Sequence, residues 1–210
     1  MGGCIAVACG DTGRFSSFSE ALARLDKPPD THVYFSKGSD RETSRNVLVR
    51  AMLDSGDDWL LFLDDDNVFA GDLLVRLLAR NVDLVGGLYL RRDRPFSAIA
   101  YGERLEDGRF IPLDLSAHGK DDLVPVLAVG TGAMLVRRRV FEGMSDPWFR
   151  RAELTEDLLF CLECGHQPHV DLGARVGHMT TATVWPSVTE DEWTVGVTVT
   201  EQVNFLMKLS

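Results

Sequence analysis

The stretch Trp59-Leu60-Leu61-Phe62-Leu63-Asp64-Asp65-Asp66 passes from five apolar residues to three aspartates without a break. A short apolar run bounded by charged residues is typical of a β-strand that is buried on both faces. Three adjacent carboxylates repel one another unless a cation or hydrogen-bond donors offset the repulsion. The stretch therefore predicts a buried strand that ends at a functional edge of a sheet.

Apolar strands and amphipathic helices alternate around this stretch through the first part of the chain. We expect strands at 5–9, 31–35, 59–63 and 82–85, with a helix after each of the first three. Continuous apolar strands separated by helices indicate a mostly parallel sheet covered by helices on both faces. One of these helices is expected to begin at a capping box formed by Ser39 and Glu42 and to end at Gly56.

The alternation of strands and long helices ends after Gly87. The segments 89–101, 110–115 and 124–136 are predicted strands joined by loops, 155–164 is a predicted helix that begins at Thr155, and 193–199 alternates as a strand does. We therefore expect an α/β fold in one domain, 1–210. Its nucleotide-binding-like half, 1–87, is Rossmann-related, and its second half, 88–210, is irregular and mixed.

Composition limits the classes of partner. The chain has 22 Lys and Arg against 32 Asp and Glu, a net charge of −10, so most of its surface repels polyphosphates. The segment 76–151 is the exception, because basic residues outnumber acidic ones there. No apolar run approaches the roughly 18 residues that span a bilayer, so no membrane association is expected. Four cysteines that form no dense disulfide framework, and an N-terminus without a basic export signal, favour the cytoplasm.

The three aspartates are the strongest candidates for a functional site, because ligands of parallel α/β sheets bind at the carboxyl ends of the strands. In an extended segment Asp64 and Asp66 point to one side and Asp65 to the other. Two carboxylates on one side suit a hard divalent cation such as Mg²⁺ or Mn²⁺. The alternative is an acidic turn that complements the dipole of the next helix.

Three other motifs could carry chemistry, and each has a structural alternative. Glu156 and Asp157 open a predicted helix, where acids either complement the helix dipole or supply a general base. His178 could be a metal ligand or a hydrogen-bonded structural histidine. Gly130-Thr131-Gly132 could let the backbone approach a ligand or could form only a turn. It matches neither a Walker loop nor a dinucleotide fingerprint.

In this order and spacing, the strand with its aspartates, the Gly130–Gly132 loop, the Glu156-Asp157 pair and His178 resemble GT-A-fold glycosyltransferases over residues 5–178. The resemblance implies a GT-A-like sheet, a bound Mn²⁺ or Mg²⁺, and a nucleotide-diphosphate sugar such as a UDP- or GDP-sugar as the donor. Compact enzymes of this type are frequent in bacteriophages and bacteria, which would place a phage-encoded protein in the host cytoplasm.

The resemblance also implies roles for individual residues. Asp66 would bind the metal, Asp64 would contact the ribose or the sugar, and His178 would complete the metal ligands. Asp65 would be the variable middle residue of a DxD motif. Asp157 would be the general base of an inverting enzyme, supported by Glu156. The remaining expected contacts are those of the sugar (Gly130, Thr131, Gly132), the nucleotide base (Gly10, Asp11, Thr12) and the donor (Arg45, Asn46).

Several alternatives stay open at this level. A nucleotidyltransferase on a related α/β scaffold, or a non-catalytic carbohydrate-binding module, would share parts of this pattern. A retaining reaction is also compatible with the sequence. The acceptor could be a glycan, a protein or a modified DNA base. Basic clusters that could meet an acceptor are Arg91, Arg92 and Arg94, then Arg137 to Arg139, then Arg150 and Arg151.

Overall fold

The computed structural model describes residues 2–9, 16–36, 40–179, 183–189, 192–200 and 203–208, with side chains described as far as residue 197. The candidate contacts to the nucleotide base, Gly10, Asp11 and Thr12, lie outside the described residues.

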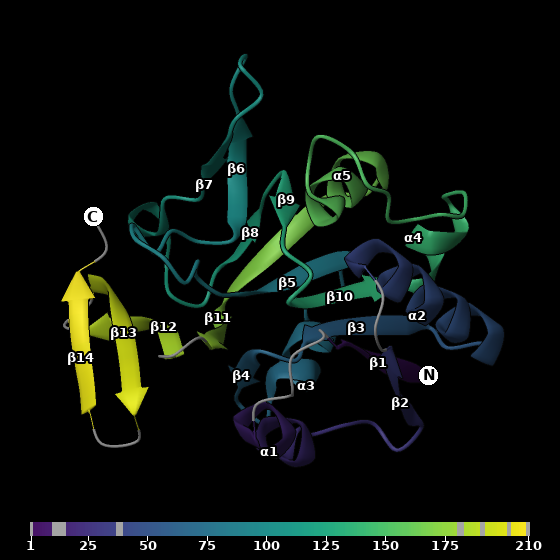
Figure 1. The fold of residues 1–210 in the computed structure, drawn as a ribbon, viewed down its shortest axis with the longest axis horizontal. Coiled ribbons are helices and arrows are strands. Elements are labelled where there is room, and N and C mark those ends of the chain that lie inside the picture. Colours follow the sequence, from purple (N-terminus) through teal and green to yellow (C-terminus); the bar gives the residue numbers. More distant parts are fainter. Residues whose placement is uncertain are drawn as a thin grey trace.

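A large central sheet takes its strands from both halves of the chain (Figure 1). The strands that run in one direction are β2 (Thr31–Ser36), β1 (Gly3–Ala8), β3 (Trp59–Asp64), β5 (Leu84–Leu88) and β11 (Pro168–Met179). β10 (Ala133–Arg137) lies antiparallel between β3 and β5. The predicted α/β class with a mostly parallel sheet is confirmed. The insertion of β10 was not predicted, because neighbours in a sheet are chosen by contacts across the whole chain.

Helices cover both faces of this sheet (Figure 1). α1 (Ser16–Arg24) and α3 (Leu73–Ala79) contribute to one hydrophobic cluster, which takes Leu61 and Leu63 from β3. α2 (Arg41–Ser55), α4 (Arg138–Glu142) and α5 (Glu156–Glu163) contribute to the other, which takes Leu60 and Phe62. Alternate side chains of a strand point to opposite faces, so a strand between two helical layers must be apolar throughout.

The start of α2 differs by one residue from the prediction. The cap of the helix is Asp40, whose Oδ1 accepts a hydrogen bond of 2.8 Å from the backbone N–H of Thr43. The expected capping residue Ser39 lies outside the described residues. The predicted end is confirmed, because Gly56 closes the helix with a φ of 76°, a conformation that glycine adopts at little cost.

The second half of the chain is built from shorter pieces. β6 (Ala100–Arg104) pairs with β7 (Phe110–Pro112) and β9 (Ala128–Val129) in a small sheet. The short helix Leu115–Ala117 follows β7 in the chain. β4 (Asn67–Phe69) and β8 (Leu123–Pro125) add to β11 of the large sheet. The predicted strands over 89–101 and 124–136 are therefore each interrupted.

The interruption of 89–101 creates a loop that matters for the site. Leu90 and Ala98 form an isolated antiparallel bridge, and the Arg91 N–H donates to the Ser97 carbonyl at 2.9 Å. Between them the chain leaves the extended conformation, and Pro95 has no N–H with which to continue a ladder. The loop 91–97 is thereby held at its base.

An antiparallel meander extends the sheet beyond β11. It consists of β12 (Thr183–Thr189), β13 (Glu192–Thr200) and β14 (Val203–Lys208), and it projects to one side of the molecule (Figure 1). The strand predicted at 193–199 lies within β13 and is confirmed. Among the helices of the described residues, none has the length and apolar character needed to cross a membrane.

Candidate active site

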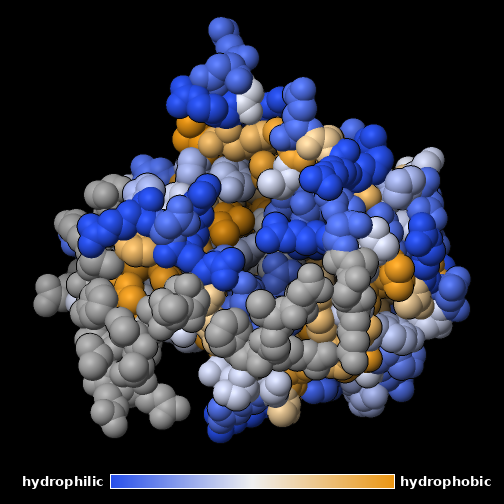
Figure 2. Space-filling model, in the orientation of Figure 1, coloured by the Kyte–Doolittle hydropathy of each residue, from blue (hydrophilic) through white to orange (hydrophobic). Residues whose placement is uncertain are grey.

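A cleft of about 330 Å³ lies at the carboxyl end of β3. Hydrophilic residues gather across the middle of the molecular face drawn in Figure 2. The cleft is lined by side chains from segments that are distant in sequence: Arg41, Arg45, Asp64, Asp66, Tyr89, Arg91, Arg92, Asp93, Ile99, Tyr101, Thr131, Thr155, Glu156, Asp157 and His178. Most of the residues that the sequence singled out for metal, sugar or proton-transfer roles therefore meet in one place.

The three aspartates divide as predicted, although for a different reason. Asp64 ends β3 on the face that α2 and α5 cover, and Asp66 also lines the cleft, whereas Asp65 does not. Asp65 and Asp66 form a turn and not an extended segment, so simple alternation does not explain their directions. The turn leads into β4, where Asn67 lies opposite His178 of β11. This strand pairing is what carries Asp66 towards His178.

His178 is oriented for ligation through its Nε2 atom. Its Nδ1 lies 2.9 Å from the backbone carbonyl oxygen of Leu90, an acceptor only, so Nδ1 carries the proton of the neutral ring. The Nε2 atom then faces Asp66 Oδ2 at 3.6 Å. Tyr89 packs edge-on against the imidazole, with the ring centroids 5.5 Å apart. A histidine whose other nitrogen is fixed by a carbonyl is typical of metal-ligating histidines.

Arg45 connects the acidic end of β3 to the acidic start of α5. Its side chain is almost fully buried and forms ion pairs with Glu156 and, at 3.4 Å, with Asp64. Glu156 is likewise buried. Arg45, expected as a donor contact, does line the cleft, but its single positive charge is shared between these two carboxylates. Arg45 therefore holds the start of α5 against the end of β3.

Asp157 lies beside this pair and keeps one carboxylate oxygen unengaged. Its Oδ1 accepts hydrogen bonds from the Thr155 hydroxyl at 2.5 Å and from the Leu158 N–H at 2.9 Å. Both bonds are local to the first turn of α5, and together they fix the rotamer of the side chain. Within the described residues Oδ2 has no hydrogen-bond partner, so it is the oxygen available to a ligand in the cleft.

The glycines of the 130–132 loop leave room for the side chains of Tyr89 and Asn67, of which Tyr89 lines the cleft. A Cβ at Gly130 would lie 2.0 Å from the Tyr89 hydroxyl oxygen, and one at Gly132 would lie 2.7 Å from Nδ2 of Asn67. The Gly132 N–H donates to that hydroxyl at 3.1 Å. Thr131, between the glycines, lines the cleft, and its buried hydroxyl has no hydrogen-bond partner among the described residues.

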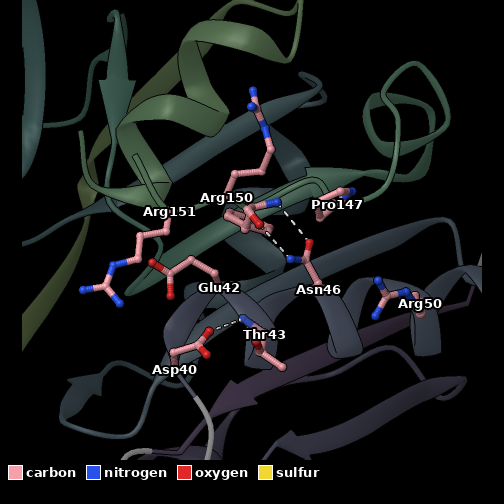
Figure 3. Close-up of a pocket in the computed structure, with 9 residues that line it drawn as sticks. Asp40, Glu42, Thr43, Asn46, Arg50, Pro147, Arg150 and Arg151 are labelled. Atoms are coloured by element: carbon pink, nitrogen blue, oxygen red, sulfur yellow. Dashed lines mark hydrogen bonds between the residues drawn. The ribbon is translucent and has the colours of Figure 1, made fainter. Parts of the chain in front are cut away.

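The structure does not bring Asn46 to this cleft. The Asn46 side chain donates to the Phe149 carbonyl at 2.7 Å and accepts from the Phe149 N–H at 3.0 Å (Figure 3). It lies instead at a neighbouring groove of about 460 Å³, between α2 and the 147–151 segment. The expectation that Asn46 contacts the donor is therefore not supported by its position. Both the nitrogen and the oxygen of its side-chain amide are hydrogen-bonded to the backbone of Phe149.

Burial and the neighbouring charges shift the pKa values of residues in the cleft. Burial raises the pKa of Asp64, with Asp66 and Asp157 adding to the rise and Arg45 opposing it. Burial alone would also raise the pKa of Asp66, but interaction with His178 and the charge of Arg92 outweigh it and hold that pKa below its ordinary value. Burial, together with the nearby carboxylates, raises the pKa of Tyr89 well above its ordinary value, so the phenol stays protonated.

Two basic residues of the cleft differ from what the sequence indicated: Arg41 was given no role, and Arg92 was expected only among the basic residues that could meet an acceptor. Arg92 Nη1 donates to Asp66 Oδ2 at 3.0 Å, and Arg41 lines the cleft one helical turn before Arg45. The i, i+4 spacing of Arg41 and Arg45 is a signal that would have placed both on one helix face. The contact between Arg92 and Asp66 has no local signal, because the loop 91–97 reaches it through tertiary structure.

The side chains of the cleft supply some, but not all, of the ligand atoms that one divalent cation needs. No group of three His, Cys, Asp or Glu side chains in the described parts of the chain is close enough to hold a metal ion by itself. Asp66 Oδ2 and His178 Nε2, 3.6 Å apart, are within reach of one ion, since bonds of roughly 2.1 Å allow ligand atoms up to about 4.2 Å apart. Metal sites that also bind substrate phosphates commonly use only one or two protein carboxylates, so the pair suffices when other ligands come from water and substrate.

Known proteins share this fold at low sequence identity. No family model matches the chain, and no curated protein matches it. The crystal structure of A197 from STIV matches with a TM-score of 0.65 and 15% identity, covering 88% of this chain and 89% of that one. GalNAc-T7, solved with UDP, GalNAc and Mn²⁺, matches with a TM-score of 0.59 and 13% identity.

The fold is GT-A-like. The match covers 85% of this chain but only 44% of the GalNAc-T7 chain, so this protein spans less than half the length of that neighbour. Within the GT-A-like fold the cleft lies at the carboxyl ends of parallel strands, where ligands of open α/β sheets bind. At such low identity the likeness extends to the fold and not to individual residues.

Proposed function

We propose that this protein is a metal-dependent glycosyltransferase that moves a sugar from a nucleotide-diphosphate sugar to an acceptor hydroxyl. The observation that carries the proposal is the meeting of Asp66, His178 and Asp157 in one cleft of a GT-A-like fold. The presence of UDP, GalNAc and Mn²⁺ in the structure of GalNAc-T7 supports the choice of a UDP-sugar or related donor.

Asp66 and His178 would hold Mn²⁺ or Mg²⁺. When bound, the ion would neutralise the charge that develops on the leaving diphosphate. Imidazole together with carboxylate suits Mn²⁺ better than Mg²⁺, which prefers an all-oxygen set. Asp64 would contact the ribose or the sugar, and Thr131 would offer its unpartnered hydroxyl to a sugar hydroxyl.

Asp157 would act as the general base of an inverting reaction. The acceptor oxygen forms a bond to the anomeric carbon while the bond from that carbon to the diphosphate oxygen breaks, and Asp157 Oδ2 takes the acceptor proton. Glu156, paired with Arg45, would keep the start of α5 in place without itself reacting. The acceptor, which could be a glycan, a protein or a modified DNA base, would enter beside Asp157.

The test is a thermal-unfolding screen of UDP- and GDP-sugars with and without Mn²⁺, followed by an assay of nucleoside diphosphate release. A donor that binds only the folded state raises the unfolding temperature by mass action. We expect a rise that requires Mn²⁺ and is lost in Asp66→Ala. The matched control is Asp65→Ala, whose residue does not line the cleft.

Three outcomes would contradict the proposal. Full activity in Asp66→Ala would remove the metal assignment. Release of pyrophosphate instead of a nucleoside diphosphate would favour a nucleotidyltransferase. Binding of sugars that is indifferent to EDTA and leads to no turnover would favour a non-catalytic carbohydrate-binding module.

A further inference from the structure

Arg92 occupies the same carboxylate oxygen that the proposed metal site needs. Its Nη1 donates to Asp66 Oδ2 at 3.0 Å and to the Met179 carbonyl at 3.1 Å. The Nε2 atom of His178 faces that oxygen at 3.6 Å. A guanidinium on one side and an imidazole on the other therefore converge on a single oxygen atom.

A divalent cation and the Arg92 guanidinium cannot both lie close to this oxygen, because like charges a few ångströms apart repel strongly at a partly buried site. We propose that Arg92 is an internal counter-cation of Asp66 that a divalent cation displaces, and that the displaced guanidinium binds the diphosphate of the donor. The second part rests on the proposed function. The first part concerns only this chain and a metal ion.

The position of Arg92 allows this exchange by side-chain movement alone. The loop 91–97 is held at its base by the Leu90–Ala98 bridge and the hydrogen bond from Arg91 to Ser97. The Arg92 side chain is 41% exposed, so it can turn within the cleft without unpacking a core. A guanidinium offers paired N–H donors that match phosphate oxygens, and Arg91 of the same loop lines the cleft beside it.

The exchange predicts that replacing Arg92 strengthens the binding of Mn²⁺ and weakens the binding of UDP. Arg92→Gln removes the competing charge, so Mn²⁺ alone should bind about three- to tenfold more tightly than to the unmodified protein. With Mn²⁺ saturating, the same variant should bind UDP about tenfold more weakly, since one phosphate contact is lost. Mn²⁺ binding is measured by the loss of the free-ion signal in electron paramagnetic resonance, and UDP binding by calorimetry.

Two further variants separate the bond to Asp66 from a general effect of charge. Arg91→Gln removes the same charge from the same loop, but Arg91 pairs with Asp93 and not with Asp66, so its effect on Mn²⁺ affinity should be smaller. Arg92→Lys keeps the charge and should bind Mn²⁺ as the unmodified protein does. Thermal unfolding confirms that each variant is folded.

The counter-cation role is overturned if Arg92→Gln binds Mn²⁺ no more tightly than Arg91→Gln does, or if none of the proteins binds Mn²⁺ at millimolar concentration. If Mn²⁺ binding tightens as expected but none of the proteins binds UDP or GDP, the counter-cation role stands, while the diphosphate contact and the donor proposed above are both rejected.

Discussion

At the scale of single residues, the orientation of Asp157 is fixed by its nearest neighbours in the chain. The Thr155 hydroxyl and the Leu158 N–H both donate to Oδ1, and the side chain lines the cleft with no hydrogen-bond partner for Oδ2 among the described residues. An asparagine can keep the same two hydrogen bonds through its own Oδ1, but its amide nitrogen cannot accept a proton. Position 157 therefore permits a test of proton transfer with little change in structure.

We expect Asp157→Asn to lower kcat by about 10²- to 10⁴-fold, the usual contribution of a general base, while donor affinity changes little. Turnover and donor binding are measured on the same preparations. Glu163→Gln, at the other end of α5 and paired with the exposed Arg150, is the control and should keep full kcat. Equal kcat values for Asp157→Asn and the unmodified protein would assign the base elsewhere.

At the scale of elements, a buried carboxylate joins α3 to the irregular part of β11. Asp171 is fully buried and accepts hydrogen bonds from Arg76, Arg80 and the Gly173 N–H. The register of β11 against β5 shifts between Asp171 and Arg175, a few residues before His178. This network therefore stabilises the bend that sets the course of β11 towards the cleft.

We expect Asp171→Asn to lower the free energy of unfolding by about 3 kcal/mol at pH 7, because two partly buried guanidinium groups lose their counter-charge. Burial alone would raise the pKa of Asp171, but hydrogen bonds from Arg80 and Arg76 outweigh it and hold the pKa below its ordinary value. The stabilisation is thus complete above the unfolded-state pKa of about 3.9 and is lost as pH falls through the folded-state pKa.

Urea unfolding from pH 7 to pH 3 measures this difference. The gap in stability between the unmodified protein and Asp171→Asn should narrow below about pH 4. Asp121→Asn, which removes an exposed partner of Arg76, should cost less than about 1 kcal/mol. A gap that stays constant down to pH 3 would mean that the Asp171 charge contributes nothing to stability.

At the scale of the whole molecule, charge is distributed unevenly around a strongly acidic average. The net charge is −10, yet the cleft exposes Arg91 and Arg92, and the segment 76–151 is the basic part of the chain. Such a protein can bind a small anion in the cleft while the rest of its surface repels a long polyanion. This balance bears directly on DNA as an acceptor.

We expect the protein to bind unmodified duplex DNA more weakly than about 10⁻⁴ M at physiological salt, the weak end of non-specific binding. Fluorescence anisotropy of a labelled duplex at several salt concentrations measures it. Affinity that falls steeply as salt rises would instead indicate several phosphate contacts and would favour a DNA acceptor. A flat salt response would remove DNA from the acceptors.

Local physical rules account for what could be predicted. The apolar faces of β3, the glycine that ends α2 and the acids that open α5 follow from burial, backbone conformation and the helix dipole, each of which acts within a few residues. The candidate residues Asp64, Asp66, Thr131, Glu156, Asp157 and His178 line the cleft as a group. Their roles in binding and catalysis stay predictions.

Only the tertiary structure decided which of these residues touch. In the tertiary structure Arg45 forms an ion pair with Glu156, and Asn46 forms hydrogen bonds with the Phe149 backbone. β10 lies between β3 and β5, and Arg92 donates a hydrogen bond to Asp66. Each contact joins segments far apart in the chain, and its energy depends on the packing of everything between them. The sequence by itself thus determined which chemical groups stand at the ends of the strands, because burial and alternation are local; folding determined their partners, because pairing is not.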